Sequence, residues 1–178
     1  MTTKIVNNKW EHIQTDVRKI KDTLGMPVDE EIFETVTVLR YLGINTSASC
    51  AGHLDRVTHG PYIHFLAPQV NQLRQQMQAI GDRKNPEYQK LLDEATYYNL
   101  HEQLKVLPYL DEFYTQRIVP YGQRIIVQLF KDAANMIVCQ GTELAYIMEE
   151  QEQAKLLRNN QNEMQFFTKF LKNKFGLS

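Results

Sequence analysis

Two kinds of hydrophobic pattern alternate along this chain, and together they constrain the fold more than any other feature. Helical patterns, with apolar residues every three or four positions, cover residues 10–24, 27–43, 68–81, 85–108 and 142–174. Short segments typical of strands lie between them at 44–50, 62–66, 124–130 and 136–139. We therefore expect an α+β fold in which helices from both ends of the chain cover a small, mostly antiparallel sheet of about four short strands.

Local signals refine three of these elements. Asp29 precedes the second helical pattern, where its carboxylate can accept hydrogen bonds from the unpaired N–H groups of the first helical turn. Strict alternation predicts that one face of the first strand carries four side chains: Ile44, Thr46, Ala48 and Cys50. The last helix is expected to break near residues 159–160, where two asparagines follow each other.

Composition limits the classes of protein that fit. The chain has 178 residues with 43% hydrophobic and 23% charged residues, and it shows no internal repeat or long linker, so we expect one domain over 1–178. A net charge of −1 does not favour nucleic acid or an anionic membrane as partner. No apolar run approaches membrane-spanning length, and the first residues lack a signal-peptide pattern. With only two cysteines, we expect a cytoplasmic protein with reduced thiols.

Residues 46–53 form the segment with the most chemistry. Cys50 lies three residues before His53, with Gly52 between them, at the end of the first strand. His59 and His64 follow, so four of the seven cysteines and histidines fall within fifteen residues. Such a cluster is typical of a metal site, a nucleophile or a turn that binds a ligand.

The first interpretation is a metal site, with zinc as the metal. Two residues separate Cys50 from His53, a spacing at which a turn directs both ligands at one ion. His59 and His64 would complete the ligand set.

The second interpretation is nucleophilic catalysis by Cys50. A thiol beside the imidazole of His53 can ionise, and the thiolate is the reactive species. The group that orients the imidazole would be a carboxylate, and the sequence leaves three candidates open: Asp29, Asp55 and Glu143.

The third interpretation makes the turn a cradle for a small polar ligand. Ser49 supplies a hydroxyl, Gly52 permits close approach of the backbone, and His53 supplies a polar ring. Gln140 and Glu143 stand at a second strand-to-helix junction and would join this site as ligand-binding residues, Glu143 also as a general base.

These interpretations lead to one expectation with two alternatives. We expect a domain that binds a small ligand or a metal ion at the turn 49–53. The first alternative is a hydrolase or transferase that depends on Cys50 or on a metal, and the second is a structural or protein-interaction module. The apolar stripe of the C-terminal helix also suggests a homodimer, with nucleic acid not expected as a partner.

The motif residues resemble a family of uncharacterised bacterial proteins over residues 24–66 and 136–173. The family pattern is Thr-x-x-Ser-Cys-x-Gly-His followed by Gln-Gly-x-Glu, and this chain matches it with the following residues: Thr46, Ser49, Cys50, Gly52, His53, Gln140, Gly141 and Glu143. Ala51 stands where the family has glutamate. The Ser-Cys-x-Gly element is also similar to one in wybutosine-synthesis proteins, where arginine follows the glycine instead of His53, so an RNA-modifying role is a further implication.

Overall fold

The computed structural model describes residues 2–22, 25–55, 60–115, 117–130 and 134–177. Its α-helices are α1 (Thr2–Lys19), α2 (Glu30–Tyr41), α3 (Val70–Ile80), α4 (Pro86–Gln103), α5 (Leu107–Thr115) and α6 (Glu150–Phe175). Its strands are β1 (Thr46–Cys50), β2 (Tyr62–Phe65), β3 (Ile125–Phe130) and β4 (Ala134–Cys139). Two short 3₁₀ helices, η1 (Tyr121–Gln123) and η2 (Thr142–Ile147), flank the β3–β4 pair.

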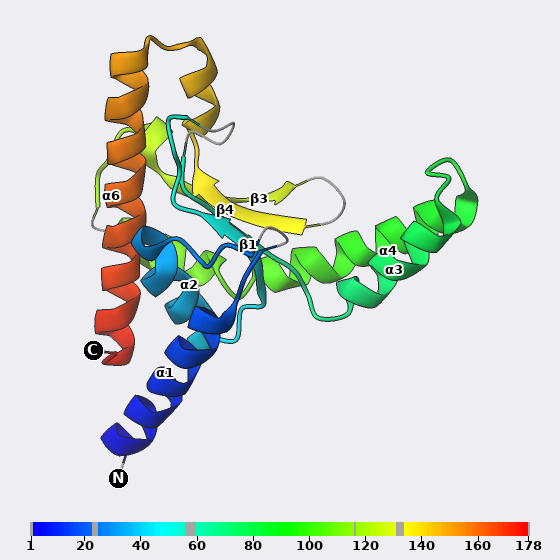
Figure 1. The fold of residues 1–178 in the computed structure, drawn as a ribbon, viewed down its shortest axis with the longest axis horizontal. Coiled ribbons are helices and arrows are strands. Elements are labelled where there is room, and N and C mark those ends of the chain that lie inside the picture. The colour runs from blue at the N-terminus through cyan, green and yellow to red at the C-terminus, as the bar shows by residue number, and fades with distance from the viewer. Residues whose placement is uncertain (1, 23–24, 56–59, 116, 131–133, 178) are drawn as a thin grey trace.

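The four strands form one sheet in the order β1-β2-β4-β3, and every neighbouring pair is antiparallel. β3 and β4 are consecutive strands that pair from Ile125 with Cys139 to Phe130 with Ala134, and residues 131–133 between them lie outside the described residues. The fold is α+β, as the sequence predicts (Figure 1). β1 lies at one edge of this sheet and β3 at the other.

The predicted alternation of β1 is wrong after Thr46. Thr46 pairs with Phe65 and Ala48 pairs with His64, so two steps along β1 correspond to one step along β2. The extra residue is a bulge, and it changes which face the following side chains occupy. Cys50 therefore shares a face with Tyr62, its partner in the register, and not with Thr46.

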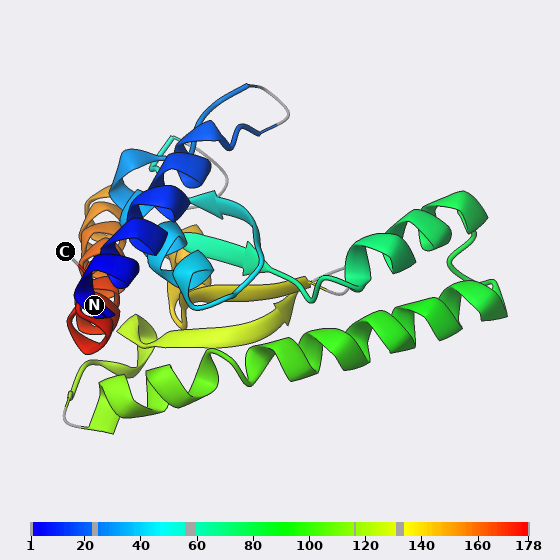
Figure 2. The same cartoon turned by 90° about the horizontal axis from the view of Figure 1, so that it is seen from below.

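Helices from both ends of the chain cover one face of the sheet, as expected (Figures 1 and 2). Ile63 and Phe65 of β2 are fully buried there against a core that α1, α2, α5 and α6 share. The α6 contribution consists of Met164, Phe167 and Leu171. The apolar stripe of α6 thus packs inside the chain, and a homodimer through this helix remains a prediction.

The last helix breaks at a different place from the predicted one. α6 runs without interruption through Asn160, and the break lies between η2 and α6. Asn160 is fully buried, and its side-chain amide donates to the Thr142 hydroxyl at 3.4 Å. An asparagine with a partner across the helix packing does not need to leave the helical conformation.

α3 and α4 lie side by side and project away from the sheet (Figures 1 and 2). Their contact has a small apolar core of its own around Leu73, Met77 and Tyr88. Asn85 caps α4 by accepting from the Glu87 N–H at 2.8 Å, and Pro86 stands at the first helical position, where its missing N–H costs no helical hydrogen bond. Among the described residues, no helix combines the length and apolar character needed to cross a membrane.

The second face of the sheet carries Tyr62 and His64, whose ring centroids lie 4.9 Å apart. Burial lowers the pKa of His64, and the positive charge of Arg74 lowers it further. In the unfolded chain the ring regains its ordinary pKa of 6.5.

We expect acid to destabilise the protein partly through His64. Below pH 6.5 the unfolded chain takes up a proton at this ring that the folded chain does not bind, so the free energy of unfolding falls as the pH drops. Urea unfolding at several pH values, in chelator, would measure this for the wild type and for His64→Gln. The variant should lose less stability between pH 7.5 and 5, and equal losses in both proteins would contradict the prediction.

Candidate functional site

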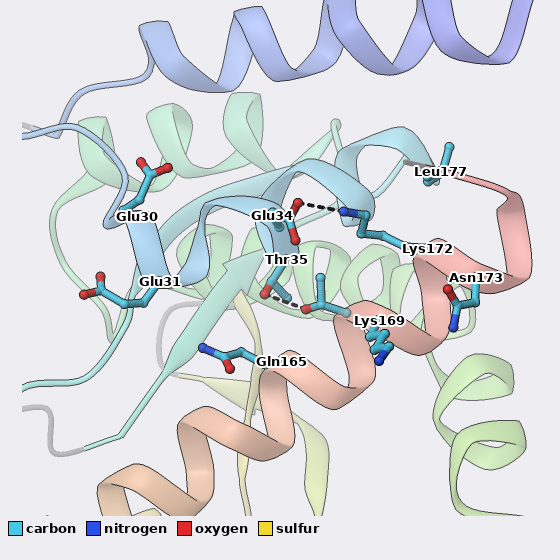
Figure 3. Close-up of a pocket in the computed structure, with 10 residues that line it drawn as sticks. Glu30, Glu31, Glu34, Thr35, Gln165, Lys169, Lys172, Asn173 and Leu177 are labelled. Carbon is cyan, nitrogen blue, oxygen red and sulfur yellow. Dashed lines mark hydrogen bonds and ion pairs between the residues drawn. The ribbon is translucent and has the colours of Figure 1, made fainter.

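The N-terminus of α2 holds one side of the site. Two contacts to α6 fix α2 in place: the buried hydroxyls of Thr35 and Thr168 lie 2.7 Å apart, and Lys172 Nζ lies 2.7 Å from Glu34 Oε1 (Figure 3). These contacts line a polar pocket of about 600 Å³ between the two helices. Asp29, at the N-cap of α2, therefore projects from a helix that packs against α6.

The turn after β1 holds the other side. Gly52 has φ +84°, and a side chain on it would lie 2.7 Å from the backbone of Gly60 and 2.7 Å from Leu157 Cδ1. Only glycine fits this conformation and this close approach. Gln161 of α6 donates through Nε2 to the carbonyl oxygens of Ala51 and Gly52, at 3.1 and 3.4 Å.

Asp29, Cys50 and His53 converge where these two sides meet. One ligand-type atom of each residue lies within 4.8 Å of those of the other two. Asp29 Oδ2 accepts the Ala51 N–H at 2.9 Å and lies 3.3 Å from His53 Nε2. Cys50 is buried, whereas the side chains of Asp29 and His53 are 27% and 29% exposed, so the cluster is sheltered but open on one side.

The role of Asp29 differs from the sequence expectation. Its side chain makes no capping hydrogen bond to α2 and instead binds the N–H of Ala51, the residue directly after β1. The positive end of the helix dipole still favours a negative charge at this position. Asp29 thus links the start of α2 to the turn that contains Cys50 and His53.

Backbone and side-chain groups near Cys50 affect its sulfur. The Gly52 N–H donates to Cys50 Sγ at 3.4 Å. Tyr62 lies opposite Cys50 in the sheet. Burial raises the pKa of Tyr62, and electrostatic interaction with Cys50 and Asp29 raises it further, so the phenol stays protonated at neutral pH.

A second pocket of about 620 Å³ opens beside the cluster, along β1. Its walls come from β1, from the α1–α2 connection and from one side of α2. The residues that line it are Ile20, Lys21, Asp22, Met26, Pro27, Val28, Asp29, Val36, Arg40, Thr46, Ser47, Ala48, Ser49, Cys50 and Tyr62. A molecule in this pocket would therefore contact two of the three converging residues.

The other predicted site residues lie in different places. Ser49 lines the pocket and Gly52 shapes the turn, whereas His64 lies on β2 outside the three-residue group. Gln140 is half-buried before η2, and Glu143 is exposed on η2. His59 lies outside the described residues.

Of the three carboxylates that the sequence left open, the structure brings Asp29 to Cys50 and His53. Asp55 is exposed after the turn. Sequence reasoning did not identify Tyr62, Arg40 or Gln161 as neighbours of the site. Of these three, only Tyr62 could have been found from the sequence, by predicting that its strand pairs with the strand of Cys50 in this register.

We expect Gly52→Ala to lower the free energy of unfolding strongly. Gly81→Ala is the matched control. Both glycines have positive φ, but a methyl group on Gly81 would meet no described atom within 4 Å. The free energy of unfolding of the control should fall by about 1–2 kcal/mol, from backbone strain alone. Gly52→Ala should lose about 2 kcal/mol more because the turn must move away from Gly60 and Leu157. Equal losses of stability in the two variants, measured by thermal or urea unfolding, would contradict the crowding at Gly52.

Comparison with protein-family models, curated proteins and solved structures gives no match to this chain. The site is therefore interpreted from its own geometry and chemistry.

Proposed function

We propose that the chain binds a transition-metal ion, with zinc as the best fit, through Asp29, Cys50 and His53. The observation that supports this most is the convergence of a carboxylate, a thiol and an imidazole within 4.8 Å of one another. Asp29, at the N-cap of α2, lies more than twenty residues before Cys50 and His53, which stand at the end of β1 and in the turn after it. Thiolate and imidazole are ligands that zinc prefers, whereas magnesium and calcium prefer oxygen.

The distances fit a tetrahedral ion with little rearrangement. Bonds of about 2.0–2.3 Å at tetrahedral angles place neighbouring ligand atoms about 3.3–3.6 Å apart. Asp29 Oδ2 and His53 Nε2 are already 3.3 Å apart. The remaining separations, at most 4.8 Å, require a shift of about 1 Å, which a side-chain rotation provides.

Three protein ligands leave one coordination position for water or a ligand. This is the arrangement of catalytic zinc sites, in which the metal lowers the pKa of bound water enough to form hydroxide near neutral pH. The pocket beside Cys50 gives a ligand access to that position. Tyr62, held protonated, is a hydrogen-bond donor on the same side. Metal-assisted hydrolysis is the reaction class that these features favour.

Nucleophilic catalysis by Cys50 is the second candidate, supported by the Gly52 N–H directed at the sulfur. A catalytic triad uses one ring nitrogen for the nucleophile and the other for the carboxylate. His53 faces Asp29 through Nε2, so Nδ1 would have to serve Cys50. A metal site needs only one nitrogen of the His53 ring, so it does not require Nδ1 to face Cys50.

We expect protein purified without chelator and supplied with zinc to retain close to one ion per chain, measured by elemental mass spectrometry. Asp29→Asn, Cys50→Ser and His53→Gln should each weaken zinc binding by more than about 100-fold, because even loss of an outer-shell partner costs about 10–100-fold. In Asp29→Asn, the amide oxygen of the new side chain would still accept the Ala51 N–H, so that variant keeps the turn anchored.

Two matched controls use the same residue types outside the cluster. Cys139→Ala and His64→Gln should retain zinc like the wild type, with circular dichroism confirming that every variant is folded. Folded wild type that binds no zinc, cobalt or nickel would contradict the proposed function. Equal zinc binding by Cys50→Ser and Cys139→Ala would contradict the assigned ligands.

Zinc should also protect Cys50 from alkylation. Cys139 serves as an internal reference because burial raises its pKa to about 12, so very little of this thiol is ionised at pH 8. With iodoacetamide, we expect Cys50 of the folded, metal-free protein to react faster than Cys139. Stoichiometric zinc should slow the Cys50 reaction about 10-fold or more, because a coordinated sulfur is no longer free to attack. An unchanged Cys50 rate would contradict coordination by this residue.

A further inference from the structure

The pocket beside the proposed metal site follows the free edge of the sheet. β1 is an edge strand, with β2 on one side and no strand on the other among the described residues. All five residues of β1, Thr46 to Cys50, line the pocket. An edge strand presents backbone N–H and C=O groups that can pair with another extended chain.

Hydrogen bonds at both ends of β1 show which backbone groups point into the pocket. Beyond the bulge, the Ala51 N–H points away from β2, to Asp29. Because the direction alternates along an antiparallel strand, Ser49 also directs its N–H and C=O away from β2, and Cys50 directs its own toward Tyr62. Before the bulge, the Thr46 carbonyl points outward and accepts from Arg40 at 2.8 Å.

The two ends of the pocket differ in charge. At the Thr46 end lies the half-buried guanidinium of Arg40, whose two hydrogen bonds both go to Thr46. The negative charge of Asp16 acts on Arg40, but in the described part of the chain no hydrogen bond or close ion pair joins Arg40 to a carboxylate. At the Cys50 end lie the three proposed metal ligands. Four residue steps separate these ends, about 13 Å at the rise of a strand.

We propose that the pocket binds an extended peptide, which adds a strand to β1 with its free α-carboxylate at Arg40 and its other end at the metal ion. The inference rests on the proposed function, because the metal forms one end of the groove. The main-chain groups of Ser49 pair with the peptide backbone, the interaction that strand addition uses. A carboxyl terminus at Thr46 makes the peptide antiparallel to β1, the commoner arrangement in sheets.

The groove also sets the length and chemistry of the peptide. A span of about 13 Å corresponds to a segment of about five residues. Side chains of that segment alternate between solvent and the opposite wall, which presents Ile20, Pro27, Val28 and Val36. Peptides with an apolar side chain at alternate positions are therefore the class that fits.

The first experiment uses zinc-loaded protein and a pool of acetylated pentapeptides with free carboxylates and randomised sequence. Peptides retained after size-exclusion separation are identified by mass spectrometry, and the most enriched one is synthesised for titration. In ¹⁵N-resolved NMR spectra, the Ser49 amide should shift saturably with this peptide. Retention of no peptide by zinc-loaded protein overturns the proposal.

Changes to the peptide test the binding mode while the protein stays intact. Amidating the carboxylate should weaken binding about 10-fold or more, because a charge-assisted bond to Arg40 is lost. N-methylation along the peptide should weaken binding at alternate residues, with the largest effect opposite Ser49. Equal effects at every position, or no effect of amidation, overturn strand addition at Arg40. Arg40→Gln should remove the preference for the free carboxylate over the amide.

The outcomes separate this inference from the proposed function. Zinc binding without peptide retention overturns the peptide groove and leaves the metal site. Peptide retention with the alternating N-methyl pattern, in protein that binds no metal, supports strand addition and contradicts the metal site. A second copy paired through β1 would appear as a concentration-dependent dimer in light scattering that peptide does not dissociate, and that result overturns the proposal.

Discussion

The carboxylate of Asp29 is the interaction on which the site depends. It stands at the start of α2, yet its hydrogen bonds go to the turn after β1, at Ala51 and His53. One side chain therefore joins a helix packed against α6 to the turn that directly follows Cys50, the last residue of β1. Because an unpaired carboxylate in a sheltered position is costly, the turn and the helix must keep their relative placement for this charge to stay satisfied. A metal ion would use the same convergence and strengthen it.

The sequence predicted the fold because its signals are local. Helix ends follow from the Asn85-Pro86 start and the glycine at 81, and the sheet follows from short β-branched segments. The errors lie where a distant contact overrides local preference. The bulge between Thr46 and Ala48 changes the face of Cys50 without any glycine or proline to mark it. Asn160 stays helical in the packed interior, where its side-chain N–H donates to Thr142 and its Oδ1 has no partner among the described residues.

The sequence predicted only part of the candidate site. Cys50 and His53 are neighbours in the chain, so spacing alone brings them together. Tyr62 lies beside Cys50 because of the register of β1 with β2, and Asp29 lies there because α2 packs with its N-terminus near the end of β1. Neither arrangement can be predicted from the spacing of residues in the sequence. Conversely, Glu143 shares a motif with these residues but is exposed on η2, since a 3₁₀ helix places it outside the packed face.

β1 is both an edge of the sheet and one wall of the pocket beside the proposed metal site, and its irregular shape fits both roles. An open edge strand risks pairing with other chains, and short length, polar residues and bulges are the usual protections. β1 has all three: five residues, serines at 47 and 49, and the irregularity after Thr46. Only a short stretch around Ser49 remains available for pairing, bounded by the Asp29–Ala51 bond at one end and by Arg40 at the other. An edge limited in this way disfavours pairing with long strands and leaves room for the short extended peptide that we propose beside the proposed metal ligands.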